Sequence, residues 1–292
     1  MENFCLGTAK LGSPDYGFAS LEHVPNTFNS FRFLSQVELL GIDRFDISPR
    51  YGDSEEMLGT YFKHCKRRPV VSSKIDNLTP GNPKTPVQML ESVNRFLKRL
   101  CIDQLEICYL HQNQLSIISD PYVQEGLSLL KERKLIRYNG VSLYSFPECD
   151  YVIESEFYDF IQVPINICDI SFYIRYIANN VSKSNFVARS LLLQGLLINR
   201  KYVETITNSD KALDYFKRID ILVNQHKLTS LQIALRFVFS LEKIDHFMIG
   251  TTSILNLKKN LKCASRRIPT ELHKKLFSMA SSPKIWANPR NW

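Results

Sequence analysis

Four side chains that can carry charge or transfer a proton stand close to the ends of three successive apolar segments. Asp46 lies at the end of the first segment and Tyr51 just after it, Lys74 ends the second in Ser-Ser-Lys, and His111 ends the third in Tyr-Leu-His. Hydride addition to a carbonyl group produces an alkoxide, so a positioned proton donor lowers the barrier. Tyr51 can be that donor, because a nearby Lys74 ammonium would lower its pKa from the ordinary value of about 10 toward working pH.

The other two side chains fit the same chemistry. Asp46 would balance the charge of Lys74, since a buried cation is costly without a partner. His111 would orient a carbonyl group by a hydrogen bond, or share the proton-donor role at lower pH. Each of the four residues alone has an ordinary structural explanation, such as capping a turn, lying at the surface or packing. The presence of all four at the ends of successive segments favours a shared site.

Eight apolar segments rich in β-forming residues are bounded by turn residues, which predicts eight strands. Most are almost continuously apolar, a pattern typical of strands covered on both faces in a parallel sheet. The predicted strands are residues 4–6, 42–47, 69–73, 105–110, 136–142, 160–166, 185–188 and 246–250.

Segments with helical periodicity separate the predicted strands. Asp53 and Glu56 form the pattern of a capping box at the start of one helix, and Thr229 and Gln232 open another in the same way. In a third predicted helix, Val87 belongs to the apolar face that is expected to be buried. The order strand, helix, strand, helix therefore holds along the whole chain.

Eight such units within 292 residues predict an α/β protein with a (β/α)8 TIM barrel, a fold of typically about 250 residues. No linker or repeat interrupts them, so residues 1–292 are expected to form one domain. A doubly wound sheet would predict G-x-G-x-x-G after the first strand, but Gly7 and Gly12 have the wrong spacing. The short C-terminal segment, about 277–292, contains Trp286 and Trp292, which are expected near the active site or, slightly favoured, packed outside the barrel.

Composition excludes several other classes of protein. The net charge of +8 comes from scattered Lys and Arg, with short clusters at 63–68 and 258–267, and no nucleic-acid-binding motif is present. No apolar run approaches the roughly 20 residues needed to span a membrane. The seven cysteines include no C-x-x-C pair, which disfavours a zinc site or disulfide framework and fits the cytoplasm. The first residues lack the features of a secretory signal.

Sequence blocks along nearly the whole chain resemble those of the aldo-keto reductase family, in particular its bacterial-type members. The first is FDISPRYGDSEEMLG at 45–59. This resemblance identifies Asp46, Tyr51, Lys74 and His111 as the catalytic tetrad. It implies an oxidoreductase that reduces an aldehyde or ketone to an alcohol with NADPH or NADH. The further blocks, in the same order, are SSK ending at Lys74, YLH ending at His111, GVSLYS from Gly140, QVPIN from Gln162, ARSLLLQGLL from Ala188 and IGTTSILNLKKNL from Ile249.

The same resemblance implies a cofactor site with two departures from the family pattern. Asn256 stands where many NADP-preferring members carry an arginine, so the choice between NADP and NAD stays open. Arg189 stands where a tyrosine commonly stacks on the nicotinamide, and its guanidinium is expected to stack or to contact the pyrophosphate. The residues implied to bind the cofactor are Ser142, Gln162, Arg189, Ser190, Gly250, Thr251, Thr252, Asn256 and Asn260.

A second hypothesis is a non-catalytic, nicotinamide-binding regulatory or assembly protein that uses the same barrel. The intact tetrad argues against it, because a pure binder has no need of Tyr51 and Lys74 together. For the enzyme, the expected partner is a small-molecule carbonyl substrate. The polar residues 112–114 after His111 suggest a sugar-like one. The sequence predicts no oligomeric state.

Overall fold

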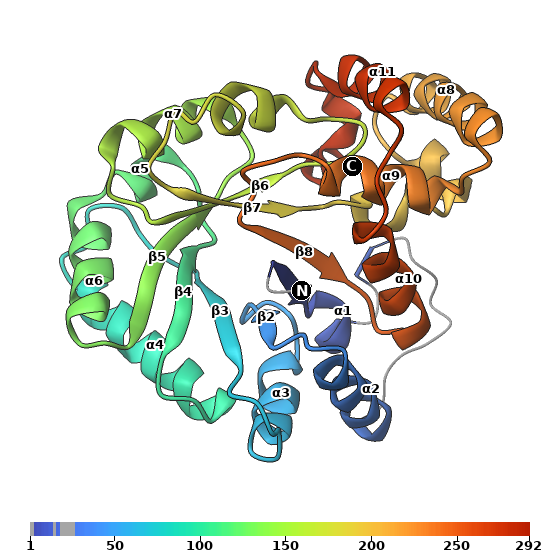
Figure 1. Cartoon of the computed structure of the whole chain (residues 1–292). Coiled ribbons are helices and arrows are strands. Elements are labelled where there is room, and N and C mark those ends of the chain that lie inside the picture. The colour runs from blue at the N-terminus through green and yellow to red at the C-terminus, as the bar shows by residue number, and fades with distance from the viewer. Residues whose placement is uncertain (1–2, 14–15, 18–26) are drawn as a thin grey trace.

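Eight parallel strands close into a barrel in which each strand pairs with its neighbours in chain order, and β8 pairs with β1 (Figure 1). The computed structural model describes residues 3–13, 16–17 and 27–292. The predicted (β/α)8 barrel is therefore confirmed. Its strands are β1 (Phe4–Gly7), β2 (Arg44–Asp46), β3 (Val70–Ile75), β4 (Leu105–Leu110), β5 (Ile136–Ser142), β6 (Phe160–Pro164), β7 (Asn185–Arg189) and β8 (His246–Gly250).

The strand register brings the candidate site residues to one end of the barrel. Lys74 is paired with Tyr109, which lies two residues before His111 in the chain, and Ser142 is paired with Gln162. Because all strands run in the same direction, their carboxyl ends meet at one rim, where active sites of this fold lie.

The barrel interior is filled by a small cluster of large side chains. Ile107, Tyr109, Phe160 and Val187 pack together there. Gly140 leaves room for them, because a Cβ at this position would come within 2.8 Å of both the Phe160 carbonyl oxygen and the Tyr109 ring. The larger core lies between the strands and the surrounding helices.

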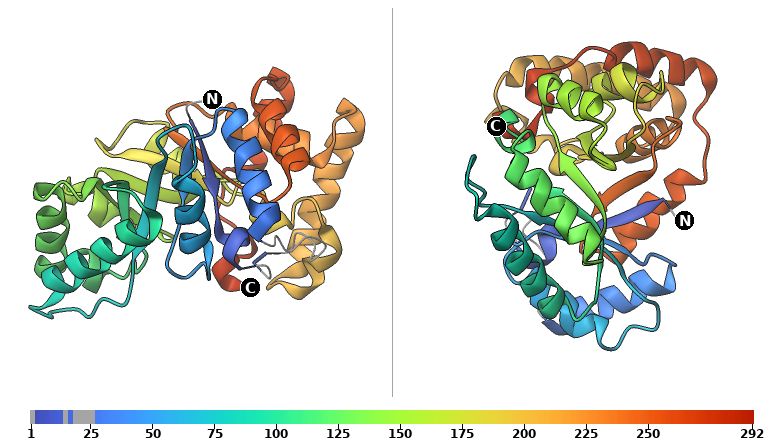
Figure 2. Two further views of the ribbon diagram at one scale, coloured as in Figure 1. Left: turned by 90° about the horizontal axis from the view of Figure 1, so that it is seen from below. Right: turned by 90° about the vertical axis from the view of Figure 1, so that its left-hand side faces the viewer.

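Helices surround the barrel, and α8 to α11 gather on the side that also carries the C-terminal residues (Figures 1 and 2). Short 3₁₀ turns span Leu193–Gly195, Arg200–Thr205, Ile285–Ala287 and Pro289–Asn291, and a π-helical turn spans Tyr173–Ile177. The helices are α1 (Ala9–Gly12), α2 (Thr27–Leu39), α3 (Ser54–Phe62), α4 (Thr85–Leu100), α5 (Leu115–Ile118), α6 (Pro121–Glu132), α7 (Phe146–Ser155), α8 (Ser209–His226), α9 (Ser230–Phe239), α10 (Ile254–Ala264) and α11 (Thr270–Ala280).

The two predicted capping boxes have different outcomes. At α9 the box is confirmed, with the Gln232 amide donating to Thr229 Oγ1 at 3.2 Å and the Thr229 amide donating to Gln232 Oε1 at 2.9 Å. At α3, Asp53 precedes the helix but its side chain makes no capping bond, so that prediction is wrong. The Asp53 backbone has φ −82° and ψ 10°, outside the extended region typical of a capping residue.

The predicted burial of Val87 is also wrong, because its side chain is 57% exposed. The buried face of α4 begins with Pro86, Met89 and Val93, which follow the helical spacing of three and four residues. Val87 lies about 100° away from this face around the helix axis.

The tryptophans of the C-terminal segment pack against the outer helices. Trp286 is buried, and its ring lies 5.5 Å from the ring centroids of both Tyr215 and Phe216 on α8. The Trp292 indole donates to the Trp286 carbonyl oxygen at 2.8 Å. Trp286 thus packs outside the barrel, while the segment as a whole lies at the barrel end toward which β1 runs (Figure 2).

All seven cysteines are unpaired. In the described ranges, no three His, Cys, Asp or Glu residues are grouped so that they could hold a metal ion. None of the helices in these ranges is both long and apolar enough to cross a membrane.

Candidate active site

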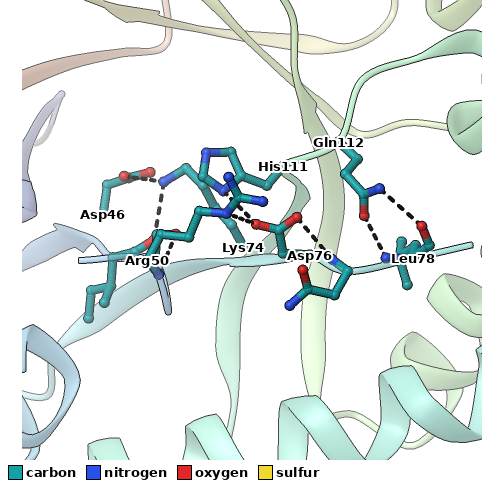
Figure 3. A network of polar contacts seen from close by, with 10 residues as sticks. Asp46, Arg50, Lys74, Asp76, Leu78, His111 and Gln112 are labelled. Atoms are coloured by element: carbon teal, nitrogen blue, oxygen red, sulfur yellow. Dashed lines mark hydrogen bonds and ion pairs between the residues drawn. The ribbon is translucent and has the colours of Figure 1, made fainter. Parts of the chain in front are cut away.

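A buried ion pair lies at the centre of the candidate site. The Lys74 ammonium donates to Asp46 Oδ1 and to the Ile47 carbonyl oxygen, the latter at 3.1 Å, and both charged side chains are almost fully buried. Burial alone would lower the pKa of Lys74, but the neighbouring Asp46 carboxylate raises it above its ordinary value. Lys74 is therefore a cation at neutral pH. In Figure 3 its amine points to Asp46, with His111 on its other side.

Tyr51 is held beside this pair by a close contact between two backbone segments. The Lys74 ammonium lies 5.3 Å from the centroid of the Tyr51 ring. A Cβ at Gly12, the last residue of α1, would lie 1.8 Å from the Tyr51 carbonyl oxygen. Gly52 adopts φ +50°, and the Ser54 amide donates to the same Tyr51 oxygen at 3.1 Å. The contact with α1 therefore fixes the turn that carries Tyr51.

The protonation of Tyr51 differs from the sequence prediction. Burial raises the pKa of Tyr51 above its ordinary value, and this effect exceeds the lowering by the Lys74 charge. The expectation of a pKa lowered toward working pH is therefore wrong. Tyr51 carries its proton at neutral pH, while the charge of Lys74 still favours the phenolate that forms when the proton leaves.

His111 is neutral and lies beside an ion pair that the sequence did not predict. Burial and the Lys74 charge lower its pKa to about 4, against the opposing effect of Asp76. His111 Nδ1 is 3.4 Å from Asp76 Oδ2, which also contacts Arg50 Nε (Figure 3). Asp76 could have been found from the sequence, because it follows Lys74 by two residues and extends the same strand face.

Ser142 and Gln162, two of the residues implied to bind the cofactor, are joined to the ion pair. Ser142 Oγ donates to Gln162 Oε1 at 3.0 Å, and Gln162 Nε2 donates to Asp46 Oδ2 at 3.0 Å. All three side chains are buried. The Gln162 amide has two N–H donors, and its oxygen and the Ser142 hydroxyl oxygen can each accept a further hydrogen bond. Both side chains can therefore bind another polar group.

Arg189, at the end of β7, is buried and stacks on the ring of Tyr144 with its Cζ 3.7 Å from the centroid. Its terminal nitrogens donate to the Leu143 carbonyl oxygen at 2.8 Å and to Ser190 Oγ at 3.2 Å. The Nε–H of Arg189 is buried without a hydrogen-bond partner. A buried donor without a partner marks a place where a polar ligand group fits.

The turn at residues 250–253 leads from β8 into α10. Ser253 caps the helix by accepting from the Asn256 amide at 3.3 Å, and Thr251 Oγ1 accepts from the Ser253 amide at 3.1 Å. Asn256 is exposed and Asn260 is buried. Backbone amides and hydroxyls at the positive end of a helix suit a phosphate group, so this turn and the unpartnered Arg189 donor fit a nucleotide cofactor.

Comparison with known proteins agrees with this geometry. The family model described as the aldo/keto reductase family matches residues 3–280. The chain belongs to this family. It is 24% identical over 296 residues to aldo-keto reductase str7 of Strobilurus tenacellus, covering 91% of this chain and 84% of that protein.

Solved structures show the same fold. PA4992 of Pseudomonas aeruginosa, which its name assigns to the aldo-keto reductases, superposes with a TM-score of 0.64 at 21% identity and covers 90% of this chain and 89% of its own. A second structure from that organism gives 0.63 at 20% identity, with the same coverage. Aldo-keto reductases are oxidoreductases that generally reduce small carbonyl compounds with NAD(P)H.

In this aldo-keto reductase, the predicted catalytic residues lie together, and the predicted cofactor-binding residues follow from the ends of β5, β6, β7 and β8 to α10. Asp46, Lys74 and His111 converge, with the Tyr51 ring beside Lys74. The residues after β8 lie in the turn at 250–253 and on α10, where Asn256 and Asn260 stand.

Proposed function

We propose that this aldo-keto reductase is an NADPH- or NADH-dependent enzyme that reduces an aldehyde or ketone to an alcohol with Tyr51 as the proton donor. The observation that carries the proposal is the buried Asp46–Lys74 ion pair beside the protonated Tyr51. A buried cation next to a neutral phenol stabilises the phenolate, which is the state that proton donation creates.

A bound nicotinamide supplies the hydride in this chemistry. Ser142 and Gln162 would hold its carboxamide with the donor and acceptor capacity that their mutual bond leaves over. The turn after β8 would hold phosphate. The remaining residues proposed to bind the cofactor are Arg189, Ser190, Gly250, Thr251, Thr252, Asn256 and Asn260.

The proton follows a short route. Tyr51 gives its phenolic proton to the oxygen of the reduced carbonyl, and Lys74 stabilises the phenolate that remains. Asp46 keeps Lys74 charged and in place through the bond to its ammonium group. His111 is neutral, so it orients the carbonyl group by hydrogen bonding and does not add a charge to the site.

Replacing Tyr51 tests this assignment. Tyr51→Phe removes only the hydroxyl, so kcat for reduction across a panel of aldehydes and sugar-like carbonyl compounds should fall by roughly 10²- to 10⁴-fold. The Kd of reduced nicotinamide, measured by fluorescence titration, should stay within about threefold because the site residues around the cofactor remain. Tyr122→Phe, which changes a tyrosine on α6 at the surface, is the matched control.

Two results would overturn the proposal. Full activity of Tyr51→Phe would show that another group donates the proton. Tight cofactor binding by the wild-type protein without turnover of any carbonyl compound would indicate instead the nicotinamide-binding regulatory or assembly role.

We further propose that residues 1–292 form one barrel domain that acts in the cytoplasm on a small-molecule substrate of sugar-like polarity. The seven unpaired cysteines support a reducing compartment. The exposed, polar Gln114 in the loop after His111 supports a hydrophilic substrate, whereas Gln112 holds this loop by bonds to the Leu78 backbone at 2.6 Å and 3.0 Å.

A further inference from the structure

Two arginine side chains enclose the ring of Tyr144, which follows β5 by two residues. The Cζ atom of Arg189 lies 3.7 Å from the ring centroid and that of Arg290 lies 3.5 Å from it. Two guanidinium groups at these distances cannot share one face of a ring without overlapping, so they occupy opposite faces. The result is a stack of arginine, tyrosine and arginine.

The stack links the C-terminal segment to the rim of the barrel. Arg290 donates to Asn113 Oδ1 at 3.1 Å, and the buried Asn113 lies two residues after His111. On the other face, Arg189 is held by the carbonyl oxygen of Leu143. The C-terminal segment therefore brings a cation to the loops that follow β4 and β5.

Within residues 3–13, 16–17 and 27–292, no carboxylate forms an ion pair with either arginine of this stack. Lys74 and Arg50 are paired with Asp46 and Asp76, whereas none of the ion pairs in the described part of the chain includes Arg189 or Arg290. The Glu148 carboxylate, at the start of α7, has an electrostatic effect on Arg290 that raises its pKa, but the two side chains do not form an ion pair.

The stack lies within electrostatic range of the catalytic tyrosine. Burial would raise the pKa of Tyr144, but Arg189 and Arg290 lower it below its ordinary value. The charge of Arg189 and the hydroxyl of Tyr144 both act on Tyr51. An uncompensated pair of cations at this place attracts an anion toward the reacting end of the barrel.

We propose that Arg290 is a specificity-determining residue that binds an anionic group, a carboxylate or a phosphate, carried by the carbonyl substrate. A guanidinium has five N–H donors in one plane, and its contacts with Asn113 and Tyr144 use only part of them. Stacking on Tyr144 fixes that plane, and Arg189 adds a second positive charge from the opposite face. This inference rests on the proposed function, because it names the substrate class of the same site.

Matched pairs of aldehydes test the proposal. The wild type should prefer 4-carboxybenzaldehyde to 4-methylbenzaldehyde, and glyceraldehyde 3-phosphate to glyceraldehyde. Arg290→Gln should lower kcat/KM for the anionic member of at least one pair by about 10- to 100-fold and for the neutral members much less. Arg290→Lys should restore part of the loss, since it keeps the charge. Arg266→Gln, a change at an exposed arginine outside the site, should leave all four values unchanged.

A second measurement distinguishes an anionic group of the substrate from a phosphate of the cofactor. If the anion were a phosphate of the cofactor, Arg290→Gln would weaken the binding of NADPH and NADH in fluorescence titrations and lower kcat/KM equally for anionic and neutral aldehydes. That result would overturn the proposal, as would equal losses without any change in cofactor binding.

A binding measurement tests the anion site independently of the proposed reaction. Calorimetry would measure the Kd of 4-methylbenzoate for the protein in the presence of NADPH. Binding that is lost in Arg290→Gln supports the anion site even if no aldehyde is turned over, in which case only the proposed function fails. The anion site would be refuted if the wild type bound neither 4-methylbenzoate nor inorganic phosphate and showed no preference for anionic aldehydes.

Discussion

At the scale of single residues, the Asp46–Lys74 pair determines how the site can work. Both side chains are almost fully buried, so their mutual attraction and the bond to the Ile47 carbonyl oxygen must compensate for the loss of water. Gln162 adds a bond to the second Asp46 oxygen. The charge on Asp46 is therefore needed both for the stability of the barrel rim and for the ammonium beside Tyr51.

Asp46→Asn keeps the size of the side chain and removes its charge, leaving Lys74 buried without a counter-ion. We expect the free energy of unfolding to fall by about 3 kcal/mol, and kcat/KM for aldehyde reduction to fall by roughly 10²-fold. Urea unfolding and steady-state kinetics measure the two effects.

The double variant Asp46→Leu with Lys74→Met separates the two roles of the pair. Replacing both charges by apolar groups should recover much of the lost stability without recovering activity. If Asp46→Asn kept both stability and activity at the wild-type level, the charge of Asp46 would have no role in the site.

At the scale of the elements, the sequence predicted the strands well because their signal is local. The runs at β4, β5 and β8 were predicted with the same boundaries as observed. The tetrad followed from strand ends and the family resemblance. The Asp53 capping box failed because the backbone of the turn, which the contact with α1 fixes, decides the direction of the side chain.

Other contacts carried no local signal. Arg290 meets Asn113 across 177 positions of the chain, so neither residue indicates the other in the sequence. The pKa of Tyr51 depends on how deeply the folded barrel buries it, and spacing alone does not give burial.

Gly12→Ala tests whether α1 positions Tyr51. The new Cβ would lie 1.8 Å from the Tyr51 carbonyl oxygen and 2.6 Å from the Ser54 amide, and neither backbone atom can move without shifting the turn. We expect kcat to fall at least about 10-fold and the free energy of unfolding to fall by about 2 kcal/mol. Kinetics and urea unfolding provide the measurement.

Gly81→Ala is the control for this variant. Gly81 has φ +71°, a backbone conformation that is strained for a residue with a side chain. However, nothing lies within 4 Å of its Cβ position. It should cost about 1 kcal/mol of stability and leave kcat unchanged. Equal kcat values for Gly12→Ala and the wild type would mean that the contact with α1 does not position the catalytic tyrosine.

At the scale of the whole molecule, the net charge of +8 acquires a partial explanation. Within the site, Lys74 and Arg50 are neutralised by aspartates, whereas Arg189 and Arg290 keep their charge around Tyr144. Part of the excess charge thus faces the end of the barrel where a cofactor and an anionic substrate are proposed to bind. Basic side chains elsewhere, such as those of Lys258 and Lys259, are exposed.

Histidine protonation makes the stability of the whole barrel depend on pH. His111 has a pKa of about 4 in the folded protein, below its ordinary value, and burial also lowers the pKa of His246 and His273. The unfolded chain therefore binds protons at these positions first as the pH falls. Their contribution to stability is complete above about pH 6.5 and is lost between that pH and about 4 for His111.

Urea unfolding of the wild type and His111→Gln at pH 7.5, 5.5 and 4.5 measures this dependence. Glutamine does not titrate, so from pH 7.5 to 4.5 the wild type should lose about 2 kcal/mol more stability than the variant. His226→Gln, at an exposed position on α8, should follow the wild-type curve. Parallel curves for the wild type and His111→Gln would show that His111 is not held neutral by the fold. The site would then carry a charged imidazole near pH 6, and that imidazolium could share the donor role assigned to Tyr51 alone.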